Sequence, residues 1–84
     1  PNHIDLPQVH QYFMSLPEVS AVHDLHIWAM SSSEVALTVH LVMPEGANRD
    51  ALLQQITREL HERYQINHPT IQIVSAPFTQ ACHG

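Results

Sequence analysis

The sequence contains no lysine and only three arginines, so positive charge is its scarcest property. Eight carboxylates leave a formal net charge of −5 at neutral pH. A protein that binds nucleic acid needs a basic surface that neutralises phosphates, and an anionic membrane surface makes the same demand. We therefore expect neither nucleic acid nor an anionic lipid surface among the partners of this chain.

Cysteine, glycine and long apolar runs are also scarce. Cys82 is the only cysteine, so no disulfide forms within the chain, and Gly46 and Gly84 do not make a glycine-rich phosphate-binding loop. No apolar run approaches the roughly 20 residues that span a bilayer, and there is no signal peptide. The chain begins with Pro1 rather than Met, which indicates a fragment or a processed product.

Histidine, by contrast, is abundant, with eight residues against three arginines. An imidazole with an ordinary pKa of about 6.5 is mostly uncharged at neutral pH and can give a ring nitrogen to a metal. A single histidine is more often a polar surface residue, but eight together favour metal chemistry. No nucleophile stands in a recognisable catalytic setting, so we expect a binding domain with neither enzymatic activity nor a small-molecule substrate.

The length of the chain predicts a single domain over residues 1–84. Apolar spacing predicts two helices, one that starts at a capping box of Asp5 and Gln8 and one that Asn48 caps. A period of two predicts strands, of which the first two form an antiparallel hairpin. In chain order the expected elements are a helix over 6–16, strands over 19–30 and 35–43, a helix after Asn48 whose apolar stripe runs from Ala51 to Tyr64, and a strand over 70–74. The ordered core is expected over about 4–75, before an irregular tail at 76–84.

This order predicts an α+β fold, namely a two-layer ferredoxin-like (metallochaperone-like) αββαβ sandwich, with a three-stranded sheet and two helices on one face. A simple hairpin register pairs Leu25 with Val39 and Ile27 with Leu37. That register puts His40 opposite Asp24 and on the other side of the sheet from His23. A β-bulge or an early strand end near His23 brings both histidines to one side.

Four motifs give a more specific indication. The strongest is VHDLHIW at residues 22–28, and it is accompanied in order by LPEV at 16–19, TVHLV at 38–42 and HPTIQI at 68–73. Together they resemble the cytosolic C-terminal domain of cation diffusion facilitators, a family of zinc, cobalt and cadmium efflux antiporters. The resemblance runs from about residue 4 to residue 74.

The resemblance implies a homodimer on the cytoplasmic side of the cell (inner) membrane, attached to the transmembrane domain of the same polypeptide. In the family, divalent ions bound here draw the two protomers together and favour transport, which underlies metal resistance. Two protomers of net negative charge repel each other, and divalent cations bound between them remove that repulsion. Protons compete for the same imidazoles, so we expect metal affinity to fall below about pH 6.5.

The resemblance also implies metal ligands. The family's ligands fall on His23, His40 and His68, and Cys82 and His83 are further candidates in the tail. Val74 stands where the family often has an acidic residue or a histidine, so one expected ligand is missing. If the register excludes His23, the alternative ligands are Asp24 and His26. Such a set suits Zn²⁺, and imidazole sites also accept Co²⁺, Cd²⁺, Ni²⁺ and Cu²⁺.

Two alternatives remain open at this point. The first is a purely structural dimerisation domain without metal sensing, which the loss of a ligand at Val74 favours. The second is a soluble metal-binding module of the chaperone type, although such modules usually carry a CxxC motif that is absent here. His10 and His61 are expected to be exposed on helices. Trp28 and Met30 are expected to pack rather than to bind a ligand, with a second protomer as one candidate partner.

Overall fold

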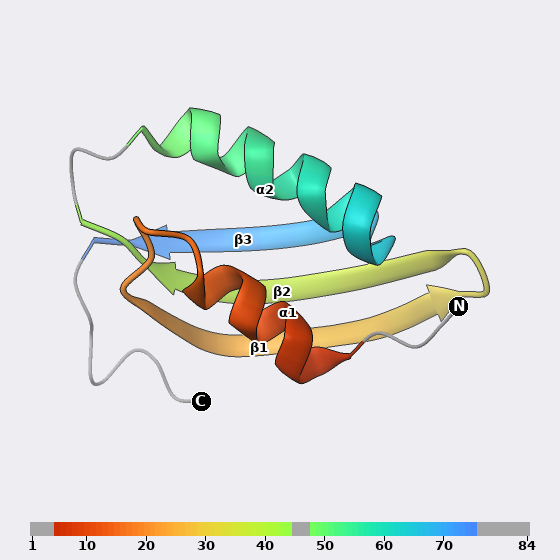
Figure 1. Cartoon of the computed structure of the whole chain (residues 1–84). Helices are drawn as coiled ribbons and strands as arrows, with labels where there is room; N and C mark the ends of the chain where they lie inside the picture. Colours follow the sequence, from red (N-terminus) through yellow and green to blue (C-terminus); the bar gives the residue numbers. More distant parts are fainter. Residues whose placement is uncertain (1–4, 45–47, 76–84) are drawn as a thin grey trace.

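The computed structural model describes residues 5–44 and 48–75 (Figure 1). Its elements follow the predicted order: α1 (Leu6–Met14), β1 (Ala21–Ser31), β2 (Glu34–Val42), α2 (Arg49–Tyr64) and β3 (His68–Val74). The strands form one sheet in the order β1-β2-β3, with β1 antiparallel and β3 parallel to the central β2. None of the helices in these two segments is long and apolar enough to cross a membrane.

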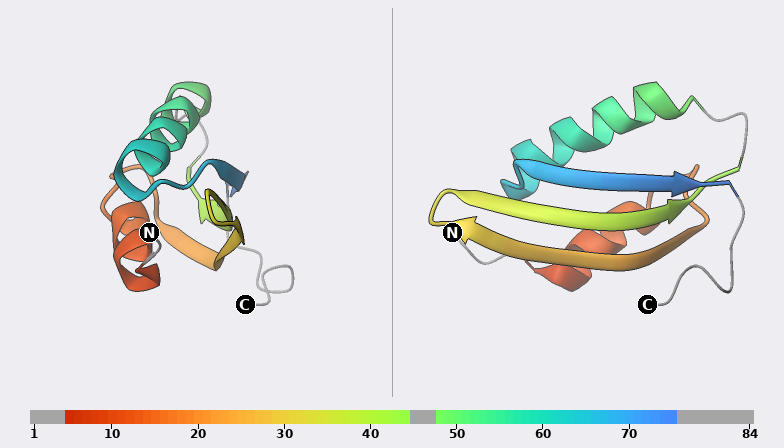
Figure 2. Two further views of the ribbon diagram at one scale, coloured as in Figure 1. Left: turned by 90° about the vertical axis from the view of Figure 1, so that its right-hand side faces the viewer. Right: turned by 180° about the vertical axis from the view of Figure 1, so that it is seen from behind.

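Both helices pack on the same face of the sheet, as predicted (Figure 2). Seen from behind, the sheet lies in front of both helices, and no helix or strand of residues 5–44 and 48–75 covers it. We call this uncovered side the open face. The hydrophobic core lies between the helices and the sheet, and its fully buried side chains are Val9, Phe13, Leu37, Val39, Leu41, Met43, Ile56, Leu60 and Ile66. The αββαβ sandwich predicted from the sequence is confirmed.

The two helices begin differently. Asn48 caps α2 by accepting a hydrogen bond from the backbone N–H of Ala51 at 3.3 Å, as predicted. Asp5 stands at the N-cap of α1, but its side chain makes no capping hydrogen bond, so the predicted capping box is wrong. Pro7 lies in the first turn, where its missing N–H costs nothing. The helix ends at Met14, two residues earlier than predicted.

The register of the hairpin contains a β-bulge. His23 pairs with His40 and His26 pairs with Thr38. Asp24 and Leu25 therefore together oppose a single residue of β2, Val39. Asp24 adopts a φ of 56°, a left-handed conformation that aspartate tolerates better than most residues. The predicted pair Ile27–Leu37 is confirmed. Two predictions are wrong: Leu25 does not pair alone with Val39, and the residues of β1 do not alternate strictly between the two faces.

The bulge has a cause in the pattern of apolar residues. Val22, Leu25 and Ile27 all pack against the core. Residues 22 and 25 are separated by three positions, and a regular strand would send them to opposite faces. One additional residue between them lets the segment before the bulge and the segment after it both direct their apolar residues into the core. The bulge therefore reconciles two apolar runs that are out of phase.

A polar contact joins the two helices on the side away from the open face. The buried Tyr12 hydroxyl donates a hydrogen bond to Glu59 at 2.5 Å, and the Arg63 guanidinium lies over the rings of Tyr12 and Tyr64 at 5.3 and 5.4 Å. Burial raises the pKa of Tyr12, and the hydrogen bond to the carboxylate raises that pKa further. This contact holds α1 beside α2.

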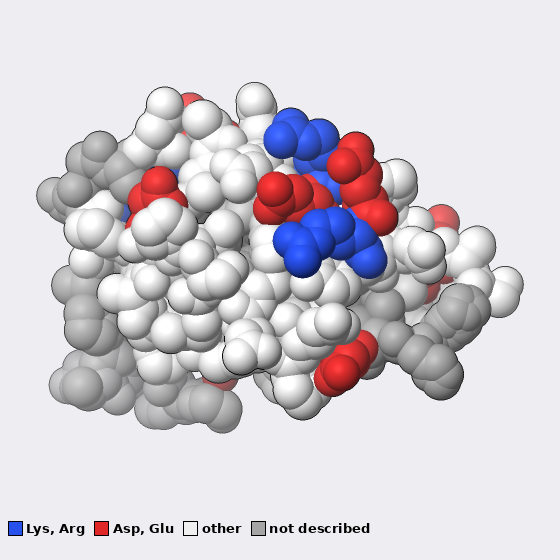
Figure 3. Space-filling view, in the orientation of Figure 1, with Lys and Arg blue, Asp and Glu red and all other residues white. Residues whose placement is uncertain are grey.

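All positive charge from arginine is confined to one helix. The three arginines of the sequence, Arg49, Arg58 and Arg63, belong to α2. Figure 3 shows basic and acidic side chains next to one another over this helix. The sheet therefore carries no lysine or arginine, and its only basic side chains are histidines.

Candidate metal centre

The strand pairing arranges the open face in rows across the sheet. His23, His40 and Gln72 form one row, and His26, Thr38 and Thr70 form the next. The third row contains Trp28, Ala36 and His68, at the hairpin end of the sheet. Neighbouring strands lie about 4.8 Å apart, and rows on one face are about 6.6 Å apart along a strand.

Of the histidines on the paired strands, His23 and His40 are brought closest together. They are direct cross-strand partners, and such partners have Cβ atoms about 4.5–5.5 Å apart on the same face. Both are half-buried. Two imidazoles at this separation can turn toward one ion, which zinc holds at about 2.0–2.1 Å from each nitrogen. The bulge that sequence reasoning invoked to bring them together is present.

Asp24, the residue with the left-handed conformation, lies beside this pair. Its Oδ2 is 3.1 Å from His40 Nδ1. The carboxylate side chain is only 18% exposed, against 34% for the imidazole. A carboxylate with this little contact with water is costly unless a partner compensates its charge. His40 is that partner in the described structure.

A small depression of about 310 Å³ opens next to these groups. It is lined by polar side chains of all three strands together with Val39: Asp24, His26, Thr38, His40, Thr70 and Gln72. His26, predicted as an alternative ligand, thus lines the same depression as His40, one row away from the pair. Its side chain is exposed.

His68 lies elsewhere. It pairs with Ala36, four residues from His40 along β2, which at about 3.3 Å per residue is roughly 13 Å. Its Nε2 is 3.6 Å from Glu34 Oε1, and both side chains are about half exposed, at 48% and 49%. Within one chain the structure does not bring His68 to the His23–His40 pair. Its role as a ligand stays a prediction.

The remaining candidate ligands divide by position. Val74 pairs with Val42, in the row next to His40 on the open face, so a ligand at this position would lie near the pair. Cys82 and His83 lie outside the described residues. Within residues 5–44 and 48–75, no group of three or more His, Cys, Asp or Glu side chains is arranged to hold a metal ion. The described part of one chain supplies two imidazoles and a neighbouring carboxylate.

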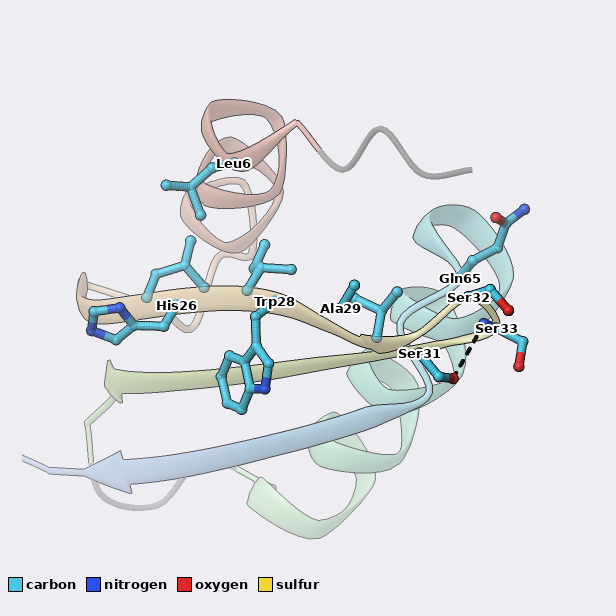
Figure 4. Close-up of a pocket in the computed structure, with 11 residues that line it drawn as sticks. Leu6, His26, Trp28, Ala29, Ser31, Ser32, Ser33 and Gln65 are labelled. Atoms are coloured by element: carbon cyan, nitrogen blue, oxygen red, sulfur yellow. Dashed lines mark hydrogen bonds between the residues drawn. The ribbon is translucent and has the colours of Figure 1, made fainter.

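A larger depression, of about 810 Å³, lies in a different place. It lies on the helix side of the hairpin end, between Leu6 of α1 and the turn at residues 31–33, where Ser33 N donates to Ser31 Oγ at 3.3 Å (Figure 4). Trp28 borders it but extends to the side of the sheet away from α1. Trp28 and Met30 are 48% and 55% exposed, so about half of each side chain is left uncovered within the chain. The prediction that they pack against a second protomer remains open.

Comparison with known proteins decides the family. The family model described as "Cation efflux protein, cytoplasmic domain" matches residues 1–75. The chain belongs to this family. The cation diffusion facilitator resemblance found in the sequence motifs is thereby confirmed.

Individual relatives agree with this family assignment. The chain is 38% identical over 82 residues to the metal cation efflux system protein CzcD of Cupriavidus metallidurans, which covers 96% of this chain and 26% of CzcD. It is 41% identical over 69 residues to the zinc transporter ZitB of Escherichia coli, which covers 82% of this chain and 20% of ZitB. The chain therefore spans about a quarter or less of these relatives.

A solved structure extends the likeness to the fold. The metal-bound C-terminal domain of the CzcD transporter superimposes with a TM-score of 0.76 at 36% identity, covering 84% of this chain and 99% of that chain. A cation efflux cytoplasmic domain thus has the same two-layer architecture as this chain.

Sequence reasoning missed the contact between Asp24 and His40. It treated Asp24 as an alternative ligand and placed it opposite His40 in a regular register. The sequence did contain a signal, because Val22 and Leu25 are three positions apart and a regular strand would point them to opposite faces. That spacing indicates an irregularity between residues 22 and 25, and the strand pairing and the backbone conformation identify Asp24 as the added residue.

Proposed function

We propose that this chain is the metal-sensing and dimerising cytoplasmic domain of a divalent-cation efflux transporter. Zinc is the ion we consider first, and cobalt and cadmium follow from the same ligand chemistry. The observation that carries the proposal is the direct pairing of His23 with His40 on the open face. The metal-bound state of the related CzcD domain and the zinc transport activity named for ZitB support it.

The ion is held by His23 and His40, and the remaining ligands come from outside the described part of one chain. Zinc takes four ligands in closed sites, and a second protomer facing the same surface can provide an equivalent pair. The tail residues Cys82 and His83 are the other source. Either source makes metal binding and protomer contact interdependent.

The charge distribution favours this coupling. The sheet has no lysine or arginine, whereas Asp24 and Glu34 lie on it, so two open faces approach each other without an arginine or lysine to offset their carboxylates. A divalent cation between them supplies the missing positive charge. A ligand shifts an equilibrium only by its differential affinity for the two states, and an ion that binds between protomers has such a difference. In the whole transporter, we propose that closure of the protomers favours transport by the membrane domain.

The proposal is tested by titrating the metal-free protein with ZnCl₂ in a calorimeter and by sedimentation velocity with and without zinc. We expect zinc binding, and a closer or more stable dimer in its presence. A His23→Ala/His40→Ala double variant should lose both. Unchanged zinc binding by this variant would instead favour a purely structural dimerisation domain, for which the hydrophobic Val74 is the specific argument.

Competition with protons provides an independent check. Ligating imidazoles must be deprotonated, so zinc binding releases protons and weakens as the pH falls below the ordinary imidazole value of about 6.5. Titrations near pH 7.5 and near pH 5.5 should therefore differ in affinity. Equal affinities at the two values would contradict binding through histidine.

A further inference from the structure

The bulge adds one residue to β1, and the side chain of that residue contacts a proposed ligand. Without Asp24, the positions 22, 23, 25, 26 and 27 would alternate regularly, with His23 still opposite His40 and Leu25 opposite Val39. With Asp24 in the chain, the bulge keeps the two histidines paired and the core intact, although a strand without this residue would need no bulge to do so. What it contributes is the Asp24 carboxylate itself, held at the edge of the His23–His40 pair.

The backbone at this position is specialised for that purpose. Asp24 has a positive φ of 56°, which for a residue other than glycine is uncommon. Bulges frequently re-aim a side chain next to a functional site. Here the re-aimed carboxylate is four-fifths shielded from solvent and reaches Nδ1 of His40 at 3.1 Å.

The chemistry of this contact selects one form of the imidazole. An ionised carboxylate only accepts hydrogen bonds, and a neutral histidine carries its proton on one of its two ring nitrogens. A favourable contact with Asp24 Oδ2 requires the proton on Nδ1. The other nitrogen, Nε2, then keeps its lone pair and is the atom that can bind a metal.

We propose that Asp24 is a positioning residue that fixes the Nδ1–H tautomer and the orientation of His40, so that Nε2 is available to the ion. This inference rests on the proposed metal-binding function and deepens it. It replaces the earlier expectation that Asp24 is an alternative ligand. Carboxylate partners of ligating histidines orient the ring and raise its basicity, and their loss typically costs 10- to 100-fold in metal affinity.

The first test needs no metal. Long-range ¹H–¹⁵N NMR of the imidazoles in the metal-free protein, at a pH where histidine is neutral, reports which ring nitrogen carries the proton. We expect His40 in the Nδ1–H form in the wild type, and a shift toward the Nε2–H form in Asp24→Gly, which keeps the positive φ without strain. Wild-type His40 in the Nε2–H form would overturn the inference.

The second test is zinc affinity by calorimetry, with Co²⁺ absorption to report the coordination number. Asp24→Gly should bind zinc about 10- to 100-fold more weakly with an unchanged Co²⁺ spectrum. Asp24→Asn, which keeps an oxygen acceptor without the charge, should be intermediate. Deletion of Asp24, which restores regular alternation, should show the same weakening as the glycine variant. Unchanged affinity, or a Co²⁺ spectrum that shows a lost ligand, would overturn the positioning role.

Glu34→Gln is the matched control, because Glu34 also contacts a histidine on the same face but lies at the other end of the sheet. It should change neither the His40 tautomer nor the zinc affinity. If the wild type shows the Nδ1–H form but binds no zinc, the orientation of His40 by Asp24 stands and the proposed function fails. If zinc binds and the Asp24 variants behave as wild type, the proposed function stands and this inference fails.

Discussion

The open face carries two histidine–carboxylate pairs, which differ in their distance, their burial and their surroundings. The pair of Asp24 and His40 is close, at 3.1 Å, and mostly shielded from solvent, whereas that of Glu34 and His68 is wider, at 3.6 Å, and half exposed. The first lies at a bulge beside a second histidine, and the second lies near the hairpin turn without one. Residue types alone therefore do not make a candidate site. Strand register and backbone conformation decide which pair can hold an ion.

The largest expected difference between the two pairs is in zinc binding. Replacement of His40 with alanine removes one of two adjacent imidazoles, so zinc binding should be lost at concentrations where the wild type saturates. His68→Ala should bind zinc as the wild type does. Calorimetric titration of both variants under one set of conditions checks this, and a comparable loss in His68→Ala would show that the two ends of the face act together.

A ligand can be added next to the first pair. Val74 lies in the row beside His40, and Val74→Glu places a carboxylate within reach of the proposed ion. We expect zinc affinity to increase about tenfold, equivalent to roughly 1.4 kcal/mol. Ser32→Glu, which adds the same charge at the exposed hairpin turn far from the pair, is the position control. An equal gain at both positions would point to general charge attraction rather than ligation.

The backbone at the bulge should contribute to stability independently of metal. Asp24→Val puts a β-branched residue at a positive φ, and such strain costs about 1–3 kcal/mol. Asp24→Gly lacks the carboxylate as well but suits the conformation. The difference between the two free energies of unfolding in urea isolates the backbone term. Equal stabilities would mean that the bulge relaxes when its residue is changed.

A carboxylate contact outside the open face provides a reference for these effects. Tyr12→Phe removes the hydrogen bond to Glu59 and should cost about 1–2 kcal/mol at neutral pH. Because burial raises the pKa of Tyr12, the folded state favours the neutral phenol. The resulting stability is complete below the unfolded pKa of about 10 and is lost as the pH rises above it. Urea unfolding across this range should show a steeper alkaline decline in the wild type than in the variant.

The smallest effect is expected at the exposed pair. Glu34→Gln removes a half-exposed ionic contact, and such contacts contribute about 0–1 kcal/mol. The free energy of unfolding should change by less than that of Tyr12→Phe. A larger loss would indicate that Glu34 contributes through the hairpin turn rather than through His68.

Much of the fold could be predicted from the sequence because its local signals agree with the tertiary structure. The apolar stripe of α2, its Asn48 cap and the alternation in β2 each specify an element and its buried side, and the structure keeps all three. The shorter α1 and the absent Asp5 cap escaped prediction, because helix ends depend on local hydrogen bonds that several geometries satisfy.

The site was harder to predict than the fold. His23 and His40 could be named, but their meeting depends on one bulged residue, Asp24, which is 16 positions away from His40 in the chain. A bulge changes which side every preceding residue faces, and periodicity alone does not locate it. His68 could be named equally well, yet its partner on β2 is set by how α2 returns the chain to the sheet. Only the three-dimensional register separates it from the pair.

The bulge also bears on solubility. β1 and β3 are the two edges of the sheet, and edges with free backbone groups invite pairing with other chains. A bulge in β1 and Pro69 in β3 each interrupt the regular ladder that an incoming strand would need. Deletion of Asp24, which removes the bulge between His23 and His26, would therefore produce a protein that aggregates edge to edge more readily than the wild type.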